Sequence, residues 1–166
     1  MVPCGSQVDL GGLAQVTADR APQPPTVCLP SDMPHPMMFD EADPLLNRLR
    51  TLALAFPDAA EKISHGHPAF FTTKVFAYYG GSVKIDGVYQ QHEHSLLVLV
   101  DPDERAALLG EDCCFVPAYL GPYGWIGMDL TGDTDWNEVD ELLDASYRRT
   151  AGPRRVARLD LRGSPA

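Results

Sequence analysis

The sequence has few cysteines, few basic residues and no long apolar run. Its four cysteines form no CxxC pair, which argues against a zinc ribbon or a disulfide-stapled fold. No segment approaches the roughly 18 uninterrupted apolar residues of a membrane-spanning helix. The first residues also lack a basic stretch followed by an apolar one, the pattern of a secretion signal. We therefore expect a cytoplasmic globular protein with no membrane partner.

Basic residues are outnumbered, because 13 Lys and Arg face 23 Asp and Glu and give a formal net charge of -10. An acidic globule repels nucleic acid within a Debye length of about 10 Å. Six arginines and a single aspartate nevertheless gather in residues 148–162. Phosphate contacts would come chiefly from this segment, so the predicted nucleic-acid-binding residues are Arg148, Arg149, Arg154, Arg155 and Arg158. The alternative is that Arg148 and Arg149 offset a helix dipole while the later arginines are solvated.

Three parts follow from composition. Residues 1–40 contain seven prolines and no sustained apolar period, so they predict a disordered N-terminal tail. Residues 41–157 predict one folded domain, and residues 158–166 a short basic C-terminal tail. Met37 and Met38 stand just before the first periodic segment, so either is a candidate translation start.

Helices are predicted where an aspartate precedes an apolar pattern of helical period. Asp43 before Pro44, Asp101 before Pro102, and Asp135 are candidate N-caps for helices over 43–56, 101–109 and 135–151. Runs of β-branched and aromatic residues predict strands at 61–64, 69–72, 75–79, 95–100, 115–119 and 125–130. Turns are expected at 80–82 and at Asp86-Gly87, the latter a type I′ hairpin.

The links between these strands are too short for parallel crossovers. The sequence therefore predicts an α+β, two-layer sandwich with an antiparallel sheet and helices on one face. The expected order is one helix, three or four strands, a helix, two strands and a helix.

The segment 119–130, YLGPYGWIGMDL, contains a glycine-hinged turn. Gly121 and Pro122 predict a tight reversal, because proline presets one backbone torsion and glycine admits positive φ. Tyr123 and Trp125 then follow a two-residue period, which predicts that both rings leave one face of a strand.

Three blocks, HGHPAFFTTKVFA, GPYGWIGMDL and DWNEVDELLDASYRRTAGPRRV, together resemble the MmcQ/YjbR-like family of small bacterial proteins. The blocks occur in the family's order, and the resemblance covers roughly residues 43–156. That family is commonly labelled DNA-binding. The resemblance thus implies a non-enzymatic binding protein with DNA as its partner. Because the rest of the chain is acidic, we expect this binding to be weak and non-specific and to come from the arginines. It also implies an antiparallel sheet like that of secretion chaperones.

The resemblance places Lys74 near the GPYGW turn, which suggests a second kind of ligand. A cation beside aromatic faces suits a small anionic or planar molecule, or a nucleotide base. The predicted ligand-binding set is Lys74, Tyr119, Tyr123, Trp125 and His67. The alternative is that Trp125 is core and Lys74 a solvated strand end. A third possibility is a protein-interaction module, since chaperone-like sheets pair through exposed faces or edges.

Metal and catalytic sites are not predicted. The pairs His65/His67 and His92/His94 each place two imidazoles on one face of a strand, but no third ligand is clear. Cys113 and Cys114 are interpreted as one small apolar filler and a neighbour on the opposite face. Neither these cysteines nor Ser64 has a nucleophile elbow or an oxyanion frame. We therefore expect no enzyme and no cofactor.

Overall fold

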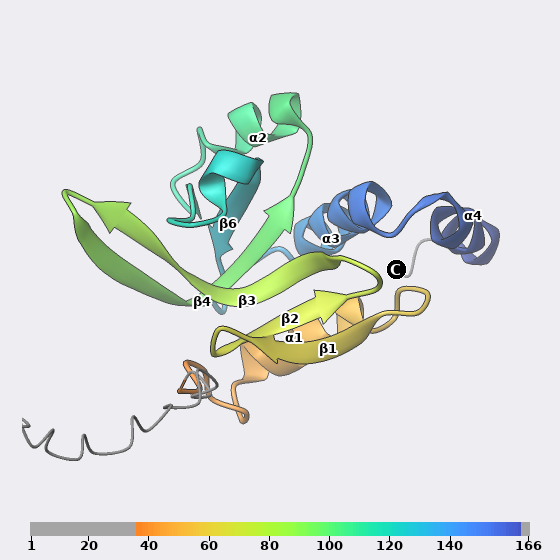
Figure 1. Cartoon of the computed structure of the whole chain (residues 1–166), viewed down its shortest axis with the longest axis horizontal. Helices are drawn as coiled ribbons and strands as arrows, with labels where there is room; N and C mark the ends of the chain where they lie inside the picture. The colour runs from red at the N-terminus through yellow and green to blue at the C-terminus, as the bar shows by residue number, and fades with distance from the viewer. Residues whose placement is uncertain (1–35, 164–166) are drawn as a thin grey trace, which may run out of the picture. The chain divides into compact units, whose positions relative to one another are not determined.

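The computed structural model describes residues 36–163, which form a six-stranded antiparallel sheet with four α-helices (Figure 1). The strand order is β1-β2-β3-β4-β6-β5. In chain order the elements are α1 (Pro44–Ala53), β1 (Ala60–Ser64), β2 (His67–Phe71), β3 (Val75–Ile85), β4 (Val88–Leu99), α2 (Pro102–Leu108), β5 (Cys114–Phe115), the 3-10 turn η1 (Gly121–Tyr123), β6 (Trp125–Asp129), α3 (Trp136–Thr150) and α4 (Pro153–Arg162). The predicted α+β class with an antiparallel sheet is confirmed. No helix within the described range has the length and apolar character to span a membrane.

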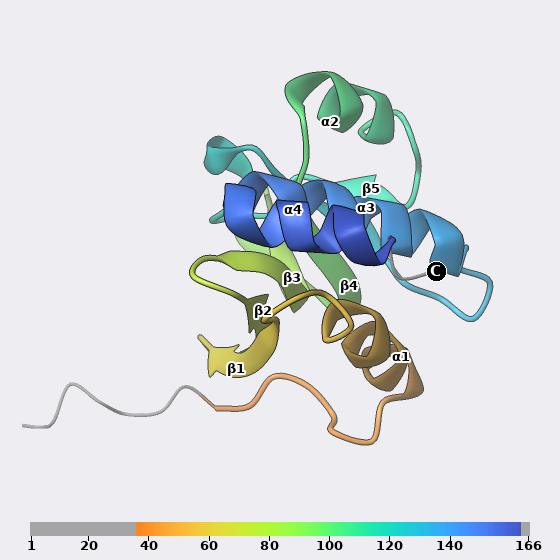
Figure 2. The same cartoon turned by 90° about the vertical axis from the view of Figure 1, so that its right-hand side faces the viewer.

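Two helices cover one face of the sheet, as predicted. Figure 1 shows α1 behind β1 and β2, and α3 packs against β3 and β4 (Figure 2). The Asp43 carboxylate caps α1 by accepting a 2.9 Å hydrogen bond from the Leu45 N–H, and Asp135 caps α3 through the Asn137 N–H at 2.9 Å. The predicted apolar face of α3 is buried in full and consists of Val139, Leu142, Leu143, Ser146 and Tyr147.

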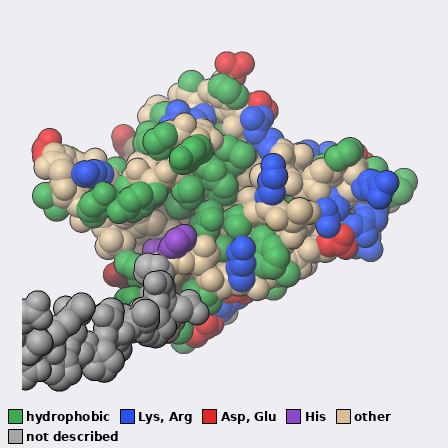
Figure 3. All heavy atoms as spheres, in the orientation of Figure 1, with side chains coloured by type: hydrophobic (Ala, Val, Ile, Leu, Met, Phe, Trp, Pro, Cys, Tyr) green, Lys and Arg blue, Asp and Glu red, His purple; other side chains and the backbone are tan. Residues whose placement is uncertain are grey.

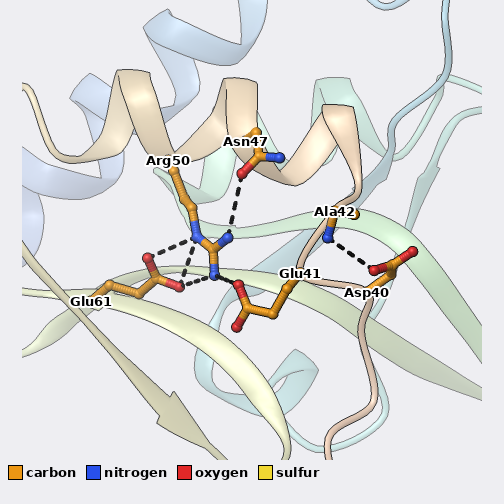
Figure 4. Close-up of polar contacts among 6 residues, drawn as sticks. All are labelled: Asp40, Glu41, Ala42, Asn47, Arg50 and Glu61. Carbon is orange, nitrogen blue, oxygen red and sulfur yellow. Dashed lines mark hydrogen bonds and ion pairs between the residues drawn. The ribbon is translucent and has the colours of Figure 1, made fainter.

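A partly buried ion pair joins α1 to β1 (Figure 4). The Arg50 guanidinium donates to both carboxylate oxygens of Glu61 at 2.8 to 3.0 Å, and it also contacts Glu41 at 2.8 Å. Because two parallel N–H groups donate to one carboxylate, this pairing fixes the relative orientation of the two side chains as well as the distance between them. This pair therefore sets the position of α1 against the first strand.

Ser146 and Tyr147 of α3 carry their polar atoms into the core with partners. The Ser146 hydroxyl donates to the Phe76 carbonyl and accepts from the Leu99 N–H at 3.0 Å, so α3 bridges β3 and β4. The Tyr147 hydroxyl donates to the Pro57 carbonyl at 2.7 Å. Its ring packs against those of Phe56 and Phe76, with centroids 4.9 and 5.4 Å away. Both hydroxyls that α3 carries into the core therefore have hydrogen-bond partners.

The two predicted tails need correction where the structure describes them. Residues 158–162 are not a tail but the second half of α4, in which Leu159 is 1% exposed. The arginine-rich composition hid this helix, because a single buried leucine gives no clear apolar period. Residues 1–35 of the predicted N-terminal tail, with Cys4 and Cys28, lie outside the described residues. Within its last five residues, the Met38 N–H donates to the Gly66 carbonyl at 2.9 Å.

The predicted turn at 80–82 is part of strand β3 instead and lies opposite a bulge in β4. Gly80 has a φ of +77°, and the pairing of β3 with β4 shifts register between Tyr79 and Gly81. Glycine adopts this positive φ without steric cost, so β3 passes the irregularity and continues to Ile85. The hairpin beyond it turns at Asp86 and Gly87, whose φ values of +49° and +82° confirm the predicted type I′ turn.

Two further predictions fail near β5. The strand expected over 115–119 is only Cys114–Phe115, because Pro117 follows and the chain turns toward η1. The Asp101 side chain does not cap α2; its carboxylate pairs with Arg149 at 2.5 Å. Figures 1 and 2 show α2 apart from α1, and none of its residues is buried.

Candidate functional site

The sheet face opposite α1 and α3 is apolar. The pairing of Tyr78 with Leu97, and of Leu97 with Gly127, places these three residues in one row on that face. The Trp125 ring lies 5.4 Å from that of Tyr78. A Cβ on Gly127 would come within 2.4 Å of the Phe115 ring, so glycine lets that ring lie flat over β6. Figure 3 shows hydrophobic side chains gathered across this open face.

An exposed aromatic cluster borders the open face. The rings of Tyr89, on the β3–β4 hairpin, and Tyr119, in the loop before η1, stack with centroids 5.5 Å apart and planes 10° apart. The Ala118 N–H donates to the Ser82 carbonyl at 2.8 Å and joins the loop to the hairpin. We call the exposed apolar side chains of these two segments the aromatic rim; they are Ile85, Val88, Tyr89, Val116, Tyr119 and Tyr123.

The predicted set of ligand-binding residues is not gathered into one pocket. Trp125 is 8% exposed at the start of β6, whereas Tyr123 is 76% exposed in η1, so the prediction that both rings leave one strand face is wrong. Gly124 lies between them with a φ of +89° and breaks the alternation. Tyr119 stacks on Tyr89 rather than on either ring.

The other two members of that set lie elsewhere. Lys74 is exposed in the turn between β2 and β3, and its side chain has no hydrogen bond or ion pair to the part of the chain that the structure describes. His67 lies on β2, with its imidazole against Gly80. Burial lowers the pKa of His67, so the ring is neutral near pH 7. A role for these residues in ligand binding stays a prediction.

Four of the five predicted nucleic-acid-binding arginines form ion pairs within the molecule. Arg148 contacts Asp144 at 2.5 Å and Asp160 at 2.8 Å, and Arg149 contacts Asp101.

Arg155 and Arg158 share the carboxylate of Asp58. The hydrogen bond from Arg158 is the main reason why the pKa of Asp58 lies below its ordinary value. Arg154 is exposed and has no ion pair with a described residue. Figure 3 shows acidic side chains among the basic ones over this end of the molecule. The arginines therefore do not form an unpaired cationic surface.

The two histidines of β4, His92 and His94, contact different partners. Between Tyr79 and Gly81 of β3, the paired positions on β4 run from Leu96 to His92, so β4 holds two extra residues there. The His92 Nδ1 lies 2.7 Å from the Asp129 Oδ1, and its ring lies 4.0 Å from that of Phe115 on the open face. The predicted placement of His92 and His94 on one strand face is wrong, because the bulge breaks the alternation.

The buried residues Asp43 and Tyr79 form a junction with the exposed His94 that sequence reasoning missed. The Asp43 Oδ2 accepts from the Tyr79 hydroxyl and lies 2.8 Å from the His94 Nδ1, which is 3.0 Å from the Tyr79 Oη. Tyr79 is 1% exposed and Asp43 7%, while His94 borders a cavity of about 370 Å³ with Met38 and Phe39. These residues are far apart in the chain, and only the capping role of Asp43 had a local signal.

Electrostatics within this junction favour an ionised Asp43. Burial by itself would raise the pKa of the Asp43 carboxyl, but hydrogen bonds from Tyr79, the Leu45 N–H and His94 outweigh it and leave the pKa below its ordinary value. Burial and the neighbouring carboxylate raise the pKa of Tyr79, so its hydroxyl remains a donor. Among the residues from 36 to 163, no group of three potential metal ligands is close enough to hold an ion.

The two adjacent cysteines have their sulfur atoms on the same side. The Sγ atoms of Cys113 and Cys114 are 3.9 Å apart, which corrects the expectation of opposite faces. The departure arises because β5 begins only at Cys114, so Cys113 does not follow strand alternation.

Comparison with known proteins identifies a family. The YjbR family model matches residues 54–149. The chain is similar to a crystal structure of Deinococcus radiodurans protein DR2400, which carries a DUF419 domain, with 17% sequence identity and a TM-score of 0.47. The match covers 72% of this chain and 88% of the DR2400 chain. No curated protein matches the chain. Because the family model covers more than half of the sequence, the chain belongs to the YjbR family.

Proposed function

We propose that this protein is a non-enzymatic binding protein that recognises an apolar segment of another protein through the aromatic rim. The observation that carries this proposal is the exposure of large apolar side chains on two neighbouring segments. Tyr123 is 76% exposed, Tyr119 68% and Val88 65%. Single exposed apolar residues are ordinary, but Tyr89 and Tyr119 stack on each other at the surface, and a group of neighbouring exposed apolar side chains marks an interaction surface.

The chemistry of the rim suits a protein partner. Tyrosine presents a large, rigid and amphipathic surface at a low cost in conformational entropy, and it is enriched in protein interfaces. Tyr89 and Tyr119 are already held in place by their stacking, so their side chains lose less conformational entropy on binding. Lys84, with its Nζ 5.2 Å from the Tyr89 ring centroid, supplies a polar edge. An apolar centre with a charged border is the usual anatomy of such an interface.

DNA and a small anionic ligand have weaker support. Phosphate binding needs available cations, yet four of the five candidate arginines are paired with carboxylates in an acidic molecule. An anionic pocket around Lys74 would need the aromatic rings beside it, and Tyr119 stacks on the hairpin instead.

Site-specific crosslinking tests the proposal. A photoreactive phenylalanine analogue in place of Tyr123, introduced into the full chain in its native cells, should yield an adduct with a defined protein. Leu161 of α4, which is 87% exposed and lies outside the rim, is the matched control position. The Tyr119→Ser/Tyr123→Ser variant should then lose at least about tenfold in affinity for the purified partner, since interface aromatics often contribute more than 1.4 kcal/mol each. Equal crosslinking from Leu161, or unchanged affinity, would contradict the proposal.

The competing DNA function has its own measurement. Fluorescence anisotropy with duplex and single-stranded DNA, at low and physiological salt, should show no specific binding. If DNA does bind, the Arg154→Gln/Arg155→Gln variant decides whether the arginines carry it. A fall of up to about two units in the slope of log affinity against log salt would favour the arginine site over the aromatic rim.

A further inference from the structure

The vicinal cysteines lie in a geometry that suits a chelated cation. A tetrahedral ion with metal–sulfur bonds of about 2.3 Å holds two ligand sulfurs about 3.8 Å apart. The Sγ atoms of Cys113 and Cys114 are 3.9 Å apart. We propose that Cys113 and Cys114 form a two-thiolate site for a tetrahedral, thiophilic divalent cation such as Zn²⁺ or Cd²⁺.

The same geometry disfavours the obvious alternative, a disulfide between the two residues. An S–S bond is about 2.05 Å long and usually joins Cα atoms about 4.4 to 6.8 Å apart, whereas successive Cα atoms across a trans peptide are about 3.8 Å apart. A disulfide here would be strained and easily reduced. A linear two-coordinate ion fits poorly as well, because bonds of about 2.3 Å would place the sulfurs about 4.6 Å apart. A tetrahedral ion, in contrast, could bind both sulfurs with almost no change in the distance between them.

Access and charge at the pair also favour a cation. Cys113 is exposed and Cys114 partly so, which leaves an entry path from solvent. Burial, the Cys113 sulfur and the carboxylates of Glu138 and Glu111 raise the pKa of the Cys114 thiol to about 12. The free Cys114 thiol is therefore protonated and a weak nucleophile at neutral pH. The negative surroundings that oppose a thiolate stabilise a divalent cation bound to it.

Binding exchanges protons for the metal. The cation forms two metal–sulfur bonds as both S–H bonds break, and two protons pass to solvent for each ion bound. Water would complete four-coordination, because no third side chain among residues 36–163 lies close enough to bind the same ion. No oxidant is involved, and both sulfurs keep their oxidation state.

The test is a titration of the full-length protein with Cd²⁺, followed by the ultraviolet charge-transfer band of cadmium thiolate and by proton release in weak buffer. We expect one ion per chain and two protons per ion. The Cys4→Ser/Cys28→Ser variant, which removes the cysteines outside the described residues, should bind equally well. Because loss of an outer-shell contact already costs about 10 to 100-fold in affinity, Cys113→Ser should cost more than about tenfold.

Three results would overturn the proposal. They are unchanged affinity in Cys113→Ser, loss of binding in Cys4→Ser/Cys28→Ser, and one ion shared by two chains. Cys113 is exposed, so its serine variant should keep the wild-type melting temperature and the comparison remains valid. Cys114→Ser provides a second variant, which should lose the same absorption band.

Discussion

Replacing Asp43 by alanine should destabilise the fold more than the loss of an ordinary helix cap. The carboxylate accepts the Leu45 N–H of α1 at 2.9 Å and also the hydroxyl of Tyr79, which is 1% exposed. Loss of the cap costs about 1 kcal/mol. A buried hydroxyl left without its acceptor costs a further 1 to 3 kcal/mol or so. The expected loss in the free energy of unfolding is therefore about 2 to 4 kcal/mol, measured by urea denaturation with circular dichroism.

Asp135→Ala is the matched control. Asp135 caps α3 through the Asn137 N–H at 2.9 Å, but its side chain is exposed and has no tyrosine to satisfy. Its loss should cost about 1 kcal/mol. A double-mutant cycle of Asp43→Ala with Tyr79→Phe should show coupling, because the phenylalanine removes the stranded hydroxyl. If Asp43→Ala and Asp135→Ala lower stability equally, the junction contributes nothing beyond capping and the reasoning is refuted.

The same junction predicts a dependence on acid. The pKa of Asp43 is lower in the folded state than its unfolded value of about 3.9, so its stabilisation is complete above that value and is lost as pH falls through the folded pKa. Asp43→Asn keeps a good capping residue but removes the titration. Its stability should therefore decline less steeply than that of the wild type below about pH 4. Asp58, whose pKa is also lowered, keeps its own acid dependence in both proteins.

Three further comparisons test the packing. Trp125→Ala should lower the free energy of unfolding by about 3 to 5 kcal/mol in urea denaturation, because the ring is 8% exposed. Tyr123→Ala should change it by less than about 0.5 kcal/mol. Equal effects would place both rings in one environment. Leu159→Ala should cost about 2 to 5 kcal/mol, and an unchanged denaturation midpoint would show that α4 is not packed. Gly80→Ala should lower the melting temperature more than Gly87→Ala: both glycines have positive φ, but only at Gly80 would a Cβ meet another residue, at 2.7 Å from the His67 Nδ1.

Local signals were enough to predict much of this fold. An aspartate before an apolar period identified α1 and α3. Asp86-Gly87 predicted the type I′ turn because that turn requires two positive φ values, which aspartate and glycine tolerate. These features depend only on residues close together in the chain.

The errors arose where a distant residue decides the structure. The segment 80–82 has the composition of a turn, and only its pairing with β4, which bulges opposite Gly80, keeps it within a strand. That bulge in turn separates His92 from His94, so a spacing rule that assumes regular alternation failed. The Asp43–Tyr79 contact spans 36 positions, and the ion pair of Arg158 with Asp58 spans 100. No periodicity within a single segment contains such information, which is why the arginines seemed available for nucleic acid.

The ends of the sheet bear on how a protein with an exposed aromatic rim avoids aggregation by strand addition. A free edge strand is a template on which further strands can add. Here β5 has only two residues, and β1 at the other end carries the charged side chains of Glu61 and Lys62. Strand-by-strand growth into fibres is therefore discouraged at both ends. If the proposed function is correct, a partner contacts side chains of the aromatic rim rather than adding a strand to either edge.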